Sequence, residues 1–302
     1  MKDITEPKTT AVALGFFDGV HLGHRAVAGE AVKLANAMGL TPCAFTFTMK
    51  NAVTAAKAGA GLICTEDEKE SRLSELGIKK IFCPDFAEFK DMSGEDFVNE
   101  LLCKSFGAAV LCCGEDFRFG KNAASGTNEL SALCKKQGIV LAVVPAVLQN
   151  GTVISSTAVR RAISAGDMAQ ARQLLGRAYS FSFKVEHGKK LGRTINAPTI
   201  NQHFAKELLL PRFGVYASFA RVDGVWHPSV TNIGVKPTVT SEGTALAETC
   251  IIGLEQNLYG ELVEVAPVSF MRDETKFLGV EQLKAAIEDD IAKAFAICAE
   301  YK

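Results

Sequence analysis

The first half of the chain alternates short apolar runs with segments whose apolar residues recur at helical spacing. The apolar runs predict strands at residues 11–14, 41–47, 78–83, 109–113 and 139–144. The intervening segments predict a first helix that carries Val27, Ala31 and Met38 and ends at Gly39. Further helices are predicted from Thr65 to Gly77, from Ser93, and over residues 128–137. Strands that are apolar on both sides and alternate with helices are typical of a parallel sheet covered on both faces.

The second half has a different pattern. Runs rich in β-forming residues at 179–187, 214–222, 244–254 and 262–269 are separated by glycine and proline, without helices between them. A single helix is predicted over residues 280–298, with Leu283, Ile287, Ile291 and Phe295 at every fourth position. This half therefore predicts a mainly antiparallel β-barrel with a closing helix. We place the division between a first domain, 1–178, and a second, 179–302.

The composition and charge of the chain argue against some classes of partner. The 302 residues are 48% hydrophobic and 22% charged, with a formal net charge of −1. Because the charge is balanced and no apolar leader or span is present, we expect a cytoplasmic protein without a nucleic-acid or membrane partner. The nine cysteines form no CxxC pair, so they are interpreted as reduced core residues.

Two of the five histidines lie three residues apart, directly after the first predicted strand. They belong to the segment Gly15-Phe16-Phe17-Asp18-Gly19-Val20-His21-Leu22-Gly23-His24. At a strand-to-helix junction, backbone N–H groups and the helix dipole attract a phosphate, and residues three apart share a helix face. This pattern indicates a nucleotide site. Two other interpretations are a helix start without a ligand and a metal site with Asp18 as third ligand.

A second polar segment precedes another helix: Ile154-Ser155-Ser156-Thr157-Ala158-Val159-Arg160. Hydroxyl groups at a helix start can donate to a phosphate, and Arg160 follows about one turn later. The alternative is an ordinary helix cap followed by an exposed arginine.

In the second half, a glycine-rich stretch at 187–193 is followed by Pro198-Thr199-Ile200-Asn201. Glycines allow backbone amides to approach phosphates, and the oxygens of Thr199 and Asn201 suit Mg²⁺. The alternative is a hairpin loop. Glu248 lies in a β-type run, where a carboxylate could take the proton of a hydroxyl group or simply face solvent.

These segments, in this order, resemble the bacterial bifunctional riboflavin kinase/FAD synthetases along nearly the whole chain. Residues 15–24 are similar to the HxGH signature of nucleotidyltransferases, in the longer form G-x-F-D-G-V-H-x-G-H of the adenylyltransferase half. Residues 154–160 resemble that half's I-S-S-T-x-x-R segment. Residues 187–201 resemble the flavokinase G-x-x-x-G-R…P-T-x-N signature, and Ala247-Glu248-Thr249 matches its V-E-T segment.

The resemblance implies a role for each matched residue. In the first domain, a Rossmann-like nucleotidyltransferase, His21, His24 and Arg160 would stabilise the α-phosphate of ATP, whereas Glu248 would be the general base of the barrel. The ATP-binding residues would be Gly15, Phe17, Asp18, Gly19, Gly23, Ser155, Ser156, Thr157, Gly188, Gly192 and Arg193. Flavin would contact Asp116, Phe117, Arg118, Arg272 and Glu274, and Mg²⁺ would bind Thr199 and Asn201.

The implied activities are two ATP-dependent transfers. The barrel would convert riboflavin and ATP to FMN and ADP, and the first domain would convert FMN and ATP to FAD and pyrophosphate. The chain differs from the family at residues 47–51 and at Asn196-Ala197. Alternatives are a chain in which only the adenylyltransferase half is active and a flavin- or nucleotide-binding sensor without catalysis. The sequence does not indicate an oligomeric state.

Overall fold

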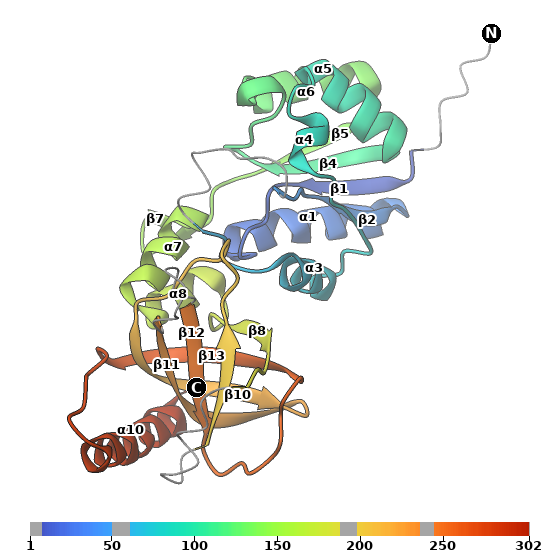
Figure 1. Cartoon of the computed structure of the whole chain (residues 1–302). Coiled ribbons are helices and arrows are strands. Elements are labelled where there is room, and N and C mark those ends of the chain that lie inside the picture. Colours follow the sequence, from blue (N-terminus) through green and yellow to red (C-terminus); the bar gives the residue numbers. More distant parts are fainter. Residues whose placement is uncertain (1–7, 50–60, 188–197, 236–244, 302) are drawn as a thin grey trace. The chain divides into compact units, whose positions relative to one another are not determined.

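The computed structural model describes residues 8–49, 61–187, 198–235 and 245–301 (Figure 1). The chain forms two compact units. The first contains residues 1–59 and 65–156, and the second contains residues 60–64 and 157–302. The predicted glycine-loop residues Gly188, Gly192 and Arg193 and the departure at 196–197 lie outside the described residues.

The first unit is built on a five-stranded parallel sheet of order β3-β2-β1-β4-β5. Its strands are β1 (Thr10–Leu14), β2 (Thr41–Phe45), β3 (Lys80–Phe82), β4 (Ala108–Gly114) and β5 (Val140–Val144). Its helices are α1 (Leu22–Met38), α3 (Glu66–Glu75), α4 (Phe86–Phe89), α5 (Gly94–Asp96), η1 (Phe97–Ser105), η2 (Lys121–Ala123) and α6 (Thr127–Gln137). A hairpin, β6 (Leu148–Gln149) and β7 (Thr152–Val153), ends the unit.

The side chains of β1 alternate between two hydrophobic cores. Val12 and Leu14 belong to a core shared with η1 and α6, whereas Ala11 and Ala13 belong to one shared with α1 and α3. Figure 1 shows these helices on the two faces of the sheet. The prediction of a parallel sheet buried on both sides is therefore confirmed.

The second unit is built on a six-stranded antiparallel sheet of order β8-β13-β10-β11-β12-β9. The strands are β8 (Phe181–Lys184), β9 (Thr199–His203), β10 (Gly214–Val222), β11 (Val225–Val235), β12 (Ala245–Ile251) and β13 (Leu262–Arg272). Helices α7 (Ser156–Ala165) and α8 (Met168–Leu175) precede it, and α10 (Val280–Glu300) follows it.

Hydrogen bonds join the two ends of this sheet into a barrel. The Glu186 N–H, just past β8, donates to the Asn201 carbonyl of β9 at 2.8 Å. The buried Gln202 amide of β9 donates to the carbonyls of Phe183 and Val263 at 2.8 Å each. These bonds satisfy edge groups that would otherwise be left unpaired. The predicted barrel with a closing helix is confirmed.

The sequence pattern did not predict β9 and β11. In β9 the polar residues Asn201 and Gln202 interrupt the apolar pattern. In β11, Pro228 lies inside the strand, where proline usually argues against a strand assignment. Both segments become strands because β12 lies between them and pairs with each.

The closing helix α10 packs its Ala294 and Cys298 against β10 and β11. A partly buried ion pair also ties α10 to the barrel: Arg272 Nε and Nη2 donate to Asp290 Oδ1 and Oδ2 at 3.0 and 2.6 Å. Asp290 is 3% exposed, and its hydrogen bonds raise the pKa of the Arg272 guanidinium. A bidentate pair of this kind fixes the geometry of both partners.

Asp290→Ala is expected to lower the free energy of unfolding of the second unit by about 3 kcal/mol, because it leaves a partly buried guanidinium unpaired. The measurement is denaturant unfolding compared with wild type. The matched control is Asp289→Ala, which removes an exposed pair with Lys293 and should cost less than about 1 kcal/mol. Equal effects of the two changes would show that the partly buried pair does not anchor α10.

The cysteines are all free thiols, and most are buried. Burial raises the pKa of both Cys112 and Cys113 to about 12. These two thiols therefore stay protonated near neutral pH and do not act as nucleophiles. Within the described residues, no helix combines the length and the hydropathy needed to cross a membrane.

Candidate active sites

The loop between β1 and α1 is a tight, strained turn. Phe17 and Val20 have positive φ values of 55° and 42°, and Gly19 has 78°. Such values are costly for non-glycine residues, above all for a β-branched one. The turn persists because the side chains of Phe17 and Val20 are buried and the Val20 N–H donates to the Phe17 carbonyl at 3.1 Å. Its effect is to place His21 at the start of α1.

His21 is the N-cap residue of α1. Its Nδ1 accepts a hydrogen bond from the His24 N–H at 3.3 Å. Nδ1 must be unprotonated to accept, so the proton of the neutral ring is on Nε2, a suitable donor to a phosphate oxygen. The His21 and His24 rings stack with centroids 3.6 Å apart. A Cβ on residue 23 would lie 3.1 Å from His21 Cε1, so Gly23 provides room for the ring.

The first turn of α1 carries no acidic side chain. Its N–H groups and the positive end of the helix dipole therefore favour an anion, and no carboxylate of the helix's own first turn competes with it. The two predicted histidines thus come together in a position suited to a phosphate, as the sequence indicated. That they bind ATP remains a prediction.

The hydroxyl-rich segment 154–160 also reaches this loop. Ser156 Oγ donates to the Asp18 carbonyl at 3.3 Å, within the first unit. Thr157 and Arg160 belong to the second unit, where Arg160 Nε donates to the Gly61 carbonyl at 2.9 Å. The grouping of Arg160 with the histidines therefore stays a prediction.

The Gly114–Gly120 loop begins at the carboxyl end of β4, which pairs with β1. This loop and the loop between β1 and α1 therefore start at neighbouring points of one sheet edge. Arg118 donates to the carbonyls of Ala123 and Ala124 at 3.1 and 3.2 Å, and these hydrogen bonds stabilise the loop that carries it. The ring of Phe117 stacks on Phe119, and Asp116 is exposed. Flavin contacts of Asp116, Phe117 and Arg118 remain predictions.

In the barrel, three polar residues form a row across neighbouring strands. Asn201 of β9 pairs with Glu248 of β12, and Glu248 pairs with Asn232 of β11. Directly paired residues point to the same face of a sheet, with Cβ atoms about 5 Å apart. Thr199 lies two residues before Asn201 and shares its face. The strand register thus places Thr199, Asn201 and Glu248 on one face of the sheet, and their roles remain predictions.

Asn201 has the features of a metal ligand. The residue is 6% exposed, and its Oδ1 is buried without a hydrogen-bond donor among the described residues. A buried amide oxygen of this kind fits a hard cation such as Mg²⁺. The described residues contain no cluster of three or more His, Cys, Asp or Glu side chains able to hold a metal. A cation here would therefore need the phosphates of ATP to complete its ligands.

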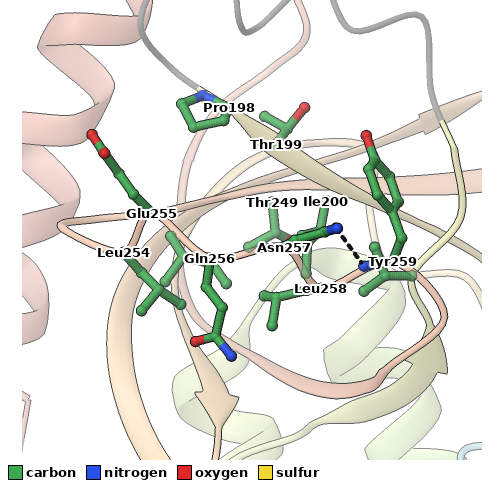
Figure 2. A pocket seen from close by; sticks show the side chains of 12 residues that line it. Pro198, Thr199, Ile200, Thr249, Leu254, Glu255, Gln256, Asn257, Leu258 and Tyr259 are labelled. Atoms are coloured by element: carbon green, nitrogen blue, oxygen red, sulfur yellow. Dashed lines mark hydrogen bonds between the residues drawn. The ribbon is translucent and has the colours of Figure 1, made fainter.

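A pocket of ≈ 420 Å³ opens beside Thr199. Figure 2 shows Thr199 and Pro198 together with the segment Leu254–Tyr259 around this pocket. Thr249 lines it and alternates with Glu248 along β12, so Glu248 faces the other side of the strand. The sequence pattern did not predict this pocket.

Two residues predicted to contact flavin, Arg272 at the end of β13 and Glu274 just after it, form polar contacts with other side chains of the second unit. Arg272 pairs with Asp290, as described above. Glu274 Oε1 accepts a hydrogen bond from Asn232 Nδ2 at 3.1 Å. The sequence pattern assigned Asn232 no role. Strand register, which the sequence does not reveal, is the signal that places it beside Glu248.

One unit has an α/β sheet with a helix start suited to an anion. The other is a barrel in which a carboxylate lies beside amide and hydroxyl oxygens. These are features of a nucleotide-dependent transferase built from two units. Comparison with protein families agrees. An FAD synthetase model matches residues 3–158, and a riboflavin kinase model matches residues 175–298. The chain belongs to the bifunctional riboflavin kinase/FMN adenylyltransferase family.

Curated relatives of that name match nearly the whole chain. The protein from Listeria monocytogenes is 33% identical, covering 92% of this chain and 89% of the relative. The one from Pseudomonas fluorescens is 32% identical, covering 97% and 94%. A solved structure titled "Macrolide-efflux Protein from Streptococcus pneumoniae" matches with a TM-score of 0.85 and 28% identity, over 100% of this chain and 97% of that one. That title describes the Streptococcus protein only.

Proposed function

We propose that the chain catalyses both transfers of its family in separate units: riboflavin kinase chemistry in the barrel and FMN adenylyltransferase chemistry in the α/β unit. The observation that carries this proposal is that each unit brings together its own group of candidate catalytic residues. The first has stacked histidines at the start of α1, and the second has Asn201 and Glu248 paired across strands. The domain division at 178/179 is part of the proposal.

In the kinase reaction, Glu248 accepts the proton of the riboflavin hydroxyl as its oxygen attacks the γ-phosphorus of ATP and ADP leaves. Thr199 and Asn201 would hold Mg²⁺, which would offset negative charge on the phosphates of ATP. The buried acceptor on Asn201 supports this assignment. We assign the pocket to the base of ATP, because Thr199 borders it and lies two residues from Asn201.

In the adenylyltransferase reaction, a phosphate oxygen of FMN attacks the α-phosphorus of ATP, and pyrophosphate leaves. The attacking phosphate is already ionised, so no strong base is required. His21 and His24 donate to the α-phosphate, where negative charge develops, and the N–H groups of α1 add to this stabilisation. Arg160 is proposed as a further donor.

A time course tests the whole assignment. Incubation with riboflavin, ATP and Mg²⁺ should produce FMN first and FAD after it, separated by chromatography. Chelation of divalent ions should stop both steps, and added Mg²⁺ should restore them. If the protein converts FMN to FAD but does not convert riboflavin to FMN, the alternative in which only the adenylyltransferase half is active would be favoured. Flavin binding without any product would favour a sensor.

A further inference from the structure

We infer that Asn232 binds a hydroxyl group on the polyol chain of the phosphate acceptor and so sets specificity for that chain. This inference rests on the proposed kinase function. It gives Asn232 a role that the sequence motifs left unassigned.

The first argument is the order of strands around Glu248. Asn201 lies on β9, Glu248 on β12 and Asn232 on β11, and β12 is the strand between the other two. Neighbouring strands are about 4.8 Å apart, so Asn232 lies on the side of Glu248 away from the proposed metal ligands. In phosphoryl transfer the base contacts the attacking hydroxyl, which lies opposite the leaving group. The nucleotide therefore occupies the β9 side and the acceptor the β11 side.

The second argument is the orientation of the Asn232 amide. Its Nδ2 donates to Glu274 Oε1 at 3.1 Å, and a carboxylate can only accept, so the nitrogen must face Glu274. Gly234 makes room for this carboxylate, because a Cβ on residue 234 would lie 2.2 Å from Glu274 Oε1. The Asn232 oxygen is therefore directed away from Glu274.

That oxygen still needs a donor. Asn232 Oδ1 is buried and has no hydrogen-bond donor among the described residues. A hydroxyl group supplies one, whereas a phosphate or carboxylate group supplies none. The position beside Glu248 thus favours a hydroxylated chain over an anionic one.

The experiment compares riboflavin with analogues that each lack one secondary hydroxyl of the polyol chain. Wild type should phosphorylate one of these analogues at least tenfold less efficiently than riboflavin, judged by kcat/KM. Asn232→Ala should remove most of this discrimination for the same analogue, raise the KM for riboflavin about tenfold, and leave the KM for ATP within about twofold.

Two further variants keep the test interpretable. Glu261→Gln, which changes an exposed carboxylate just before β13, is the control and should keep the discrimination. Asn232→Ser replaces Asn232→Ala if the latter fails to fold. FAD formation from supplied FMN is the internal control and should be unchanged.

Two results would overturn the inference. One is an Asn232 variant whose kcat/KM falls equally for riboflavin and every analogue. The other is a variant with a raised KM for ATP and an unchanged KM for riboflavin. A wild-type protein that never phosphorylates riboflavin would instead refute the proposed function itself.

Discussion

Replacing His24 by alanine is expected to reduce FAD formation from FMN and ATP by about 10²–10³-fold, the usual cost of losing one donor to developing charge. FMN formation from riboflavin should stay within about twofold, because Glu248 and its neighbours belong to the other unit. The measurement is the initial rate of each step, with FMN or riboflavin supplied separately.

His21→Ala is expected to have a similar catalytic effect plus a loss of stability. His21 caps α1, and removal of a cap costs about 1 kcal/mol. His24 does not cap the helix, so the pair of variants separates chemistry from stability. His227→Ala, on β11 in the second unit, serves as the control and should leave FAD formation unchanged. Normal FAD formation by a folded His24→Ala protein would remove the histidine pair from the mechanism.

Glu248→Gln is expected to show the reverse pattern. It keeps the shape of the side chain but removes the base, so FMN formation should fall by about 10²–10⁴-fold. FAD formation should persist when FMN is supplied. The comparison is again between the two initial rates, measured on one preparation.

Glu261→Gln is the matched control, since it removes a carboxylate from an exposed position just before β13. It should leave both rates within about twofold. If Glu248→Gln or His24→Ala alone abolished both activities in a folded protein, the assignment of two separate sites would fail.

Local features of the chain were predictable because their causes are close in sequence. The helix predicted from Thr65 is one case: Thr65 and Glu68 exchange hydrogen bonds at the start of α3 and so form a capping box. The helix start at His21 is another, because a cap and the free N–H groups of a first turn depend on a few neighbouring residues. The alternating pattern of the first half likewise predicted the parallel sheet.

The pairing of distant strands was not predictable in the same way. Asn232 became a candidate only because the register of β11 and β12 places it beside Glu248. The pairing of Asp290 with Arg272 likewise depends on how α10 packs against the barrel. The strands β9 and β11 lack a clear apolar alternation, so their pattern does not reveal them. Gln202 helps to close the barrel by donating hydrogen bonds to the carbonyls of Phe183 and Val263, which lie on two other strands.

By itself, the sequence determined the two halves of different architecture and the histidine pair at a helix start, because short-range patterns carry this information. Its motifs indicated Thr199, Asn201 and Glu248 as candidate site residues. Only the tertiary structure decided which strands adjoin, which side of Glu248 faces Asn232, and where a pocket opens beside Thr199. The physical reason is that strand register is set by partners far along the chain, and a shift of one residue would turn each side chain to the opposite face.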